Sequence, residues 1–291
     1  MTSQNFRGGA HTVRKLDIVS KYLTGYLTAL KSQPFRKIYF DAFAGTGDIP
    51  TNASDQPAFD FLPELGLLEG SSKRALSLTL PFDRYVLVEK SKKKAAELKE
   101  MVRTQFPERE HLVEIVVGDV NDTIGPFCQA INRSTDRAVM FLDPFGNQVW
   151  WESIERIAAT RKIDTWYLFP AGNGIFRQIS KAGKPNEMSI PSVNRLLGTD
   201  QWQSILIEET ISKDLFGNHH IDAIKTMDTG QVTEFVLELL KVPFGRDGVL
   251  DQWVPLGRSN RHEFSLIFAC ASPTGRDIAK RIASSIVKNS R

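Results

Sequence analysis

The chain has few cysteines and no long apolar run. Its 291 residues include only two cysteines, Cys128 and Cys270, which lie 142 positions apart. Two cysteines so far apart form neither a metal-binding spacing nor a disulfide framework, so we expect a reducing, cytoplasmic setting. No apolar run approaches the ~18 residues that span a membrane, and the first residues lack the apolar core of a signal peptide. We therefore expect no membrane partner.

Metal-ligand clusters and a strong charge bias are also missing. His219 and His220 have no third ligand at zinc spacing, so no metal site is expected. The 37 Lys and Arg residues nearly balance the 34 Asp and Glu residues, which gives a net charge of +3. A mildly basic chain permits a nucleic-acid partner but does not require one.

Strands and amphipathic helices alternate through the first part of the chain. Strands are predicted at 37–41, 85–89, 112–117, 138–143 and 165–169, and helices at 12–31, 73–80, 92–106, 123–132 and 150–160. Thr12, Ser71 or Ser72, and Asp122 are expected to cap three of these helices. The alternation predicts an α/β fold with a doubly wound, Rossmann-like parallel sheet, whose strands all have their carboxyl ends at one edge.

The alternation stops after residue 170. Helical patterns at 193–197, 202–209 and 232–240 predict a helical insertion over 171–248. Two strands, 252–256 and 263–269, joined by a polar turn at 257–260, then predict an antiparallel hairpin at the sheet edge, and helix 276–287 ends the chain. We expect residues 1–170 to form the core, and residues 249–291 to complete it.

The first strand runs into a turn with two glycines, Gly45 and Gly47. Glycine has no Cβ, so a ligand can touch the main chain there. The connection that follows, 48–68, is longer than usual and indicates a functional lid. Ligands of open α/β sheets bind outside the carboxyl ends of the strands, which is where this turn is expected to lie.

Acids stand at the ends of four successive strands, namely Asp41, Glu89, Asp119 and Asp143. Each alone is an ordinary cap or surface charge, but four in order beside the glycine turn favour a nucleoside pocket. Glu89 is placed to accept hydrogen bonds from both ribose hydroxyls, and Asp119 from an adenine amino group. Asp41 faces the turn, where a positively charged ligand group would be favoured.

A nicotinamide enzyme is the alternative for a Gly-x-Gly turn. It needs a third glycine, where this chain has Pro50, and a ribose acid about 20 residues after the glycines. Here Glu89 lies 42 residues after Gly47. Without a diphosphate-binding loop, the pattern favours a cofactor that carries no phosphate, such as S-adenosylmethionine.

Taken together, these motifs resemble those of a known enzyme class. Tyr39–Gly47, Glu89, Gly118-Asp119 and Leu142–Phe145 resemble the ordered motifs of class I S-adenosylmethionine-dependent methyltransferases. The narrower resemblance is to the three-Cys-motif partner family, and it is carried by His11, Lys15, Tyr22-Leu23, Glu69–Ser72, Phe141–Gly146 and Glu263–Ala269. It spans most of residues 10–285 and implies a partner protein with a cysteine motif, which this chain itself lacks.

The resemblance implies roles for particular residues. The implied cofactor contacts are Asp41, Phe43, Ala44, Gly45, Gly47, Glu89, Lys90, Asp119 and Val120. Asp143, Pro144 and Phe145 would face the methyl acceptor, and His11, Lys15, Trp150 and Asn173 are candidate substrate contacts. In related amino-methyltransferases the motif is Asp/Asn-Pro-Pro-Tyr/Phe: the acid and a proline carbonyl accept hydrogen bonds from an exocyclic amine, and the ring stacks on the base. Here one proline is missing, so the aromatic ring stands one position early.

The expected function is methyl transfer from S-adenosylmethionine to an amino group of a nucleic-acid base, which an enzyme must flip out of a duplex. Two basic regions, Lys90–Lys94 and Arg258 to Arg281, are either phosphate contacts or solvated surface. The alternative function is a methyltransferase-like binding module with little or no transfer activity that works with a partner protein. The missing proline favours that alternative.

Overall fold

A seven-stranded sheet forms the centre of the molecule. The computed structural model describes residues 9–50, 67–180, 183–213, 219–257 and 261–290. The strand order is β10-β11-β7-β6-β1-β4-β5. The strands are β1 (Arg36–Asp41), β4 (Arg84–Glu89), β5 (Val113–Val117), β6 (Asp136–Leu142), β7 (Ile163–Phe169), β10 (Val254–Leu256) and β11 (Phe264–Cys270).

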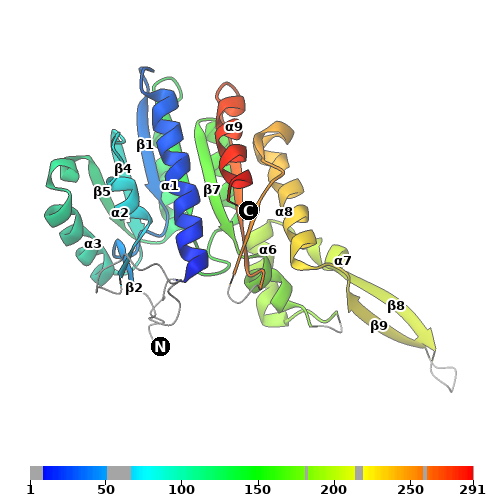
Figure 1. Cartoon of the computed structure of the whole chain (residues 1–291). Coiled ribbons are helices and arrows are strands. Elements are labelled where there is room, and N and C mark those ends of the chain that lie inside the picture. The colour runs from blue at the N-terminus through cyan, green and yellow to red at the C-terminus, as the bar shows by residue number, and fades with distance from the viewer. Residues whose placement is uncertain (1–8, 51–66, 181–182, 214–218, 258–260, 291) are drawn as a thin grey trace.

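Five strands, from β5 to β7, are parallel, whereas β11 is antiparallel to both β7 and β10. This arrangement confirms the doubly wound α/β sheet with an antiparallel edge hairpin. The parallel strands are reached through crossovers, so their carboxyl ends lie at one edge, the lower end of the sheet in Figure 1.

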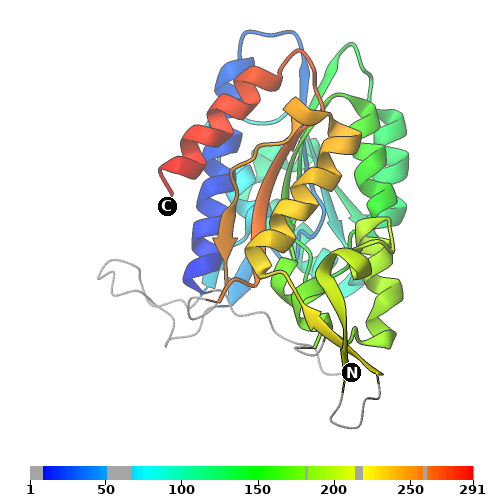
Figure 2. The same cartoon turned by 90° about the vertical axis from the view of Figure 1, so that its right-hand side faces the viewer.

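Helices cover both faces of the sheet (Figures 1 and 2). One face packs against α1 (Ala10–Leu30), α2 (Ser71–Leu76), α3 (Lys92–Gln105) and α9 (Arg276–Lys288). The other packs against α4 (Val120–Ala130), α5 (Trp151–Thr160) and α8 (Thr229–Phe244). Strands covered on both faces need apolar side chains at successive positions, which is why the central strands read as continuous apolar runs.

Adjacent residues of β1 show this division. Tyr39 points into the core under α1, and Phe40 points into the core under α4; both side chains are fully buried. On the α1 side, Tyr22 packs against Trp166 and Phe268 with ring centroids 5.5 and 4.9 Å apart. Its hydroxyl donates a 2.6 Å hydrogen bond to Asp164, so α1 is joined to β7 by a polar contact inside an aromatic cluster.

The three expected helix caps are wrong. Gly9 precedes α1 and Gly70 precedes α2, so Thr12, Ser71 and Ser72 lie inside their helices. α4 begins at Val120, three residues earlier than expected, because the side chain of Asp119 accepts the hydrogen bond from the Asn121 backbone. A sequence with several polar residues near a helix start does not show which of them adopts the extended backbone of a cap.

Residues 171–248 contain more than helices. α6 (Ile190–Leu197), α7 (Trp202–Leu206) and α8 agree with the helical patterns. A hairpin that the periodicity did not indicate, β8 (Ile207–Lys213) and β9 (His219–Lys225), extends away from the sheet (Figures 1 and 2). α8 contacts α5 and β11 and therefore covers the sheet itself. The boundaries at residues 170 and 248 stay predictions.

The long connection after the glycine turn begins and ends as a small ribbon, in which β2 (Asp48–Pro50) pairs with β3 (Leu67–Glu69). Residues 51–66 of the predicted lid (48–68) and residues 258–260 of the predicted polar turn (257–260) lie outside the described residues. No helix in the described ranges is long and apolar enough to cross a membrane. Nor do the described residues include three His, Cys, Asp or Glu side chains grouped as metal ligands.

Burial raises the pKa of Asp164 to about 6, although hydrogen bonds from Cys270 and Tyr22 oppose the shift. The folded chain therefore holds a proton here that the unfolded chain has released, and stability falls as pH rises from about 4 to about 6. Asp164→Asn is expected to remove this contribution. Between about pH 4.5 and about pH 7.5, the free energy of unfolding of this variant should rise by roughly 1–3 kcal/mol relative to that of the wild type, measured by urea unfolding.

Asp136→Asn is the control, for which the expected change in stability has the opposite sign. Although burial acts to raise it, the pKa of Asp136 is held below its usual value by its hydrogen bonds to Arg36. This variant should lose stability at neutral pH, and the loss should shrink as pH falls. An Asp164→Asn profile parallel to that of the wild type would show that Asp164 titrates normally.

Candidate functional site

Backbone hydrogen bonds fix the glycine turn at the end of β1. The Ala42 N–H donates to the Phe141 carbonyl at 3.0 Å, and the Ala44 N–H donates to the Val88 carbonyl at 2.9 Å. The turn is thus joined to both neighbouring strands. Gly45 has φ +62°, and a Cβ placed there would meet nothing within 4 Å. The backbone at Gly45 therefore has space beside it that a ligand can enter.

Gly47 serves a structural purpose instead. Its φ is +89°, and a Cβ there would lie 2.4 Å from Met101 Cε. Its carbonyl accepts a 2.7 Å hydrogen bond from the Gly70 N–H, where α2 begins. Of the two glycines predicted to contact the cofactor, Gly45 has the open face and Gly47 has the packed one.

Asp41 is fully buried at the tip of β1. Its Oδ2 accepts hydrogen bonds from the Tyr39 hydroxyl at 3.2 Å and from Ser72 Oγ at 3.0 Å, and its Oδ1 accepts from the Phe43 N–H at 3.3 Å. Burial raises the pKa of Asp41, and hydrogen bonds from Ser71 and Ser72 oppose that shift. Asp41 therefore holds the turn against α2, and its direct contact with a ligand stays a prediction.

Glu89 and Asp119 end the next two strands at the same edge. Glu89 Oε1 accepts a 2.7 Å hydrogen bond from the Ser91 N–H, which orients the carboxylate. Lys90 Nζ lies 3.0 Å from Asp119 Oδ2, with the lysine side chain 77% exposed. Although desolvation acts to raise it, the pKa of Asp119 is held below its usual value by Lys90 and Asn121. Asp119 is thus a charged hydrogen-bond acceptor at neutral pH.

Asn121 was missed by the sequence analysis, and it connects Asp119 to the segment that follows Asp143. Its backbone N–H and its Nδ2 each donate to Asp119 Oδ1 at 3.0 Å, and Nδ2 also donates to the Gln148 carbonyl at 2.8 Å. Its Oδ1 accepts from the Trp150 N–H and from Ser153 Oγ, both at 3.0 Å. The residue before it, Val120, is buried in the core. No motif marks a single asparagine in a helix start, so only the contacts identify it.

Lys15 reaches across from α1 to the end of β6. Its Nζ lies 2.5 Å from Asp143 Oδ2, and the two side chains are 4% and 22% exposed. The structure thus brings together a candidate substrate residue and a candidate catalytic residue. The remaining Oδ1 of Asp143 has no hydrogen-bond partner among the described residues.

The residues after Asp143 turn outward. Pro144 is buried, whereas the Phe145 side chain is 61% exposed, unusual for so large an apolar group. The Phe145 N–H donates to Gln148 Oε1 at 2.8 Å. Trp150 is half-buried, with the guanidinium of Arg195 4.8 Å from its ring centroid. The loop therefore presents one exposed aromatic ring beside a carboxylate.

Two amide oxygens near this loop are buried without a partner among the described residues, Asn147 Oδ1 and Asn173 Oδ1. Asn147 Nδ2 donates to the Gly174 carbonyl at 3.0 Å, so the two asparagines come from neighbouring loops that touch. Asn173 lies in a π-helical turn, Ala171–Ile175, directly after β7. Unpaired buried acceptors and π-helical turns are both enriched at functional sites.

Comparison with known proteins assigns no family, since no family model and no curated protein matches the chain. Solved structures give weak likenesses. A Legionella pneumophila protein is 15% identical over 82% of this chain and 94% of its own, with a TM-score of 0.43. A glycopeptide N-methyltransferase bound to sinefungin is 12% identical over 87% and 94%, with a TM-score of 0.37. A candidate RNA methyltransferase from Pyrococcus horikoshii is 16% identical over 72% and 84%, with a TM-score of 0.29.

The strand order by itself defines the fold class of this chain. The chain has a Rossmann-like α/β fold with an antiparallel edge hairpin, and its glycine turn and acidic strand ends lie at the carboxyl edge. Membership of the three-Cys-motif partner family stays a prediction.

Asn121→Ala is expected to destabilise the fold by about 2–3 kcal/mol, because the hydrogen-bonding groups that it leaves near α5 lose their partner. Asn289→Ala changes an exposed asparagine at the end of α9 and is the matched control. Urea unfolding of both variants measures the difference. Equal stability of the two would show that the Asn121 contacts are dispensable.

Proposed function

We propose that this chain is an S-adenosylmethionine-dependent methyltransferase whose acceptor is an amino group of a nucleic-acid base. The observation that carries the proposal is the arrangement of the carboxyl edge. The open face of Gly45, the carboxylates of Glu89 and Asp119, and the Asp143 loop all lie there, on strands that are neighbours in the sheet.

The residues at this edge fit the cofactor. The open face of Gly45 admits a ligand against the main chain, and Glu89 has a second carboxylate oxygen available for ribose hydroxyls. Asp119 can accept from an adenine amino group, and the cofactor carries no diphosphate, for which this turn has no third glycine. When bound, S-adenosylmethionine supplies an electrophilic methyl group on a sulfonium.

On the acceptor side, Asp143 Oδ1 and the Pro144 carbonyl would accept the N–H groups of an exocyclic amine, and Phe145 would stack on the base. The unpaired oxygens of Asn147 and Asn173 supply further acceptors nearby. Asp143 and Pro144 would hold the amine nitrogen toward the methyl group that the bound cofactor would supply, and the amine proton would leave to solvent. The residues contribute alignment and exclusion of water.

Lys15 adjusts the charge of this site. Its contact with Asp143 makes the pair neutral as a whole, so a neutral amine gaining positive charge meets no net cation. The pair also fixes one carboxylate oxygen and directs the other to the acceptor. His11, four residues earlier on α1, is the remaining candidate substrate contact on this helix.

The second candidate function is a binding module without transfer activity. Two features favour it: the missing proline, and the occupation of one Asp143 oxygen by Lys15. Such a module would bind the cofactor and act through a partner, which the family resemblance describes as a cysteine-motif protein. A cytoplasmic location, expected from the low cysteine content, belongs to both proposals.

Glu89→Ala is expected to weaken S-adenosylmethionine binding by at least about 10-fold, because hydrogen bonds to a charged group contribute about 1.5–3 kcal/mol each. Isothermal titration calorimetry measures the affinity. Glu234→Ala, an exposed change on α8, is the matched control and should bind as the wild type does. Unchanged affinity in Glu89→Ala would exclude the proposed ribose contact.

Asp143→Asn is expected to reduce transfer by about 100-fold or more while changing the cofactor affinity by less than about 3-fold, since it alters the acceptor contact and the contact with Lys15 but none of the residues proposed to hold the cofactor. Transfer is measured with labelled methyl groups and pools of RNA, DNA and protein. Label in a nucleic-acid pool that Asp143→Asn abolishes supports the enzyme. Absence of label in every pool, with cofactor binding intact, supports the binding module instead.

A further inference from the structure

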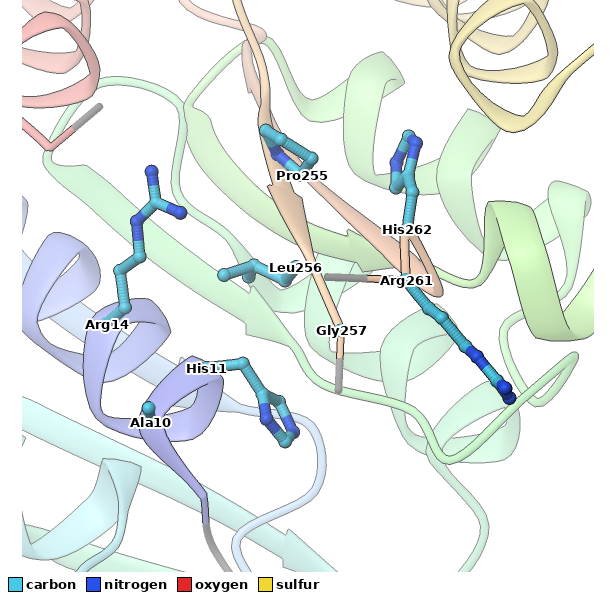
Figure 3. A pocket seen from close by; sticks show the side chains of 8 residues that line it. All are labelled: Ala10, His11, Arg14, Pro255, Leu256, Gly257, Arg261 and His262. Atoms are coloured by element: carbon cyan, nitrogen blue, oxygen red, sulfur yellow. The ribbon is translucent and has the colours of Figure 1, made fainter. Parts of the chain in front are cut away.

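A hollow of about 370 Å³ lies between the first turn of α1 and the end of β10. His11 and Arg14 line it from α1, Leu256 from the end of β10 and Gly257 from the residue after it, and Arg261 and His262 from the segment before β11. Figure 3 shows His11 and Arg14 on the α1 side of β10, and Arg261 and His262 on its other side. The hollow is separate from the glycine turn, and of its lining residues only His11 is named above as a candidate substrate contact.

The charge of the hollow is positive. None of the described residues that line it is acidic, and the first turn of α1 has no acid either. Within the described residues, neither Arg14 nor Arg261 forms an ion pair, and the nearby Glu263 is paired with Arg177 at 3.0 Å. Unneutralised guanidinium groups beside a recess favour an anionic ligand.

The positions of two lining side chains are fixed by contacts. Arg14 donates from Nε, at 2.9 Å, and from Nη2 to the Ser290 carbonyl, which leaves Nη1 for a ligand. His262 stacks on Trp253 with ring centroids 4.8 Å apart and lies 2.8 Å from Ser265 Oγ. Burial lowers the pKa of His262, so the ring is uncharged at neutral pH. The positive charge of the hollow therefore comes from the arginines.

The hollow adjoins the acceptor side of the site. β10 is antiparallel to β11, and β11 is antiparallel to β7, so β10 ends at the same edge as the parallel strands. On the other wall, Arg14 directly precedes Lys15, which contacts Asp143. The hollow and the Lys15–Asp143 contact therefore both lie beside the first two turns of α1.

The cations are spread out. Arg14 and Arg261 come from opposite sides of β10, and the Arg261 side chain points away from Arg14 (Figure 3). Because the two side chains point apart, a chain of phosphates suits them better than a single small anion. Phosphate contacts of this kind position a nucleic acid without selecting its sequence.

We propose that this hollow binds the sugar–phosphate backbone of a single-stranded nucleic acid and so positions the nucleotide next to Asp143. This inference rests on the proposed function for the identity of the neighbouring site. It assigns Arg261, one member of the second basic region of the sequence, to the ligand. Arg281 of the same region lies on α9, which begins at the opposite edge of the sheet because β11 runs antiparallel.

The test compares Arg261→Ala with Arg281→Ala in the full chain. The probes are fluorescent RNA and DNA single strands of about 12 nucleotides, followed by anisotropy from about 50 to about 200 mM salt. Arg261→Ala is expected to weaken binding about 3- to 10-fold at low salt and to reduce the slope of log affinity against log salt by about 0.7. Arg281→Ala should match the wild type.

Three results would overturn the inference. Equal losses in the two variants would show only general attraction to a basic surface. If inorganic phosphate or a nucleoside monophosphate displaces the labelled strand at as low a concentration as an unlabelled oligonucleotide does, the hollow is a small-anion site. A wild-type chain that binds S-adenosylmethionine but neither strand would exclude the nucleic acid and leave the cofactor site standing. Strand binding that depends on Arg261, with no methyl transfer, would instead support the hollow and contradict the enzyme.

Discussion

The ion pair between Lys15 and Asp143 is the contact on which the arrangement of the carboxyl edge depends. A lysine that is only 4% exposed cannot be charged there at acceptable cost unless a carboxylate faces it. The pair therefore sets where the first turns of α1 lie relative to the end of β6. That placement brings His11 and Arg14 to the same edge, beside β10.

The residues around this ion pair have two kinds of role. Asp41, Gly47 and Asn121 have their hydrogen bonds or space filled by the protein, and they hold the glycine turn, α2 and the Asp143 loop in register. Gly45 presents an open face instead, and the Phe145 side chain is 61% exposed. A site built this way has rigid supports behind exposed contacts, which is what alignment of two ligands requires.

Much of the architecture could be predicted from the sequence, because strands covered on both faces and helices with one apolar face leave clear periodic patterns. The hairpin β8–β9 could not, since Trp202–Glu209 also fits a helical pattern and the chain changes to a strand at Ile207. The helix caps were misplaced for a related reason: Thr12, Ser71 and Asp122 have suitable side chains, but which residue caps depends on the backbone that precedes it.

For this protein, the amino-acid sequence alone determined the class of sheet, the edge at which ligands are expected, and the acids at four strand ends, because local periodicity and chain direction suffice for these. Only the tertiary structure decided which of those acids are engaged by the protein itself, that Lys15 faces Asp143, and that Asn121 connects Asp119 to the segment that follows Asp143. These are contacts between residues far apart in the chain, and their formation depends on how the packed layers meet.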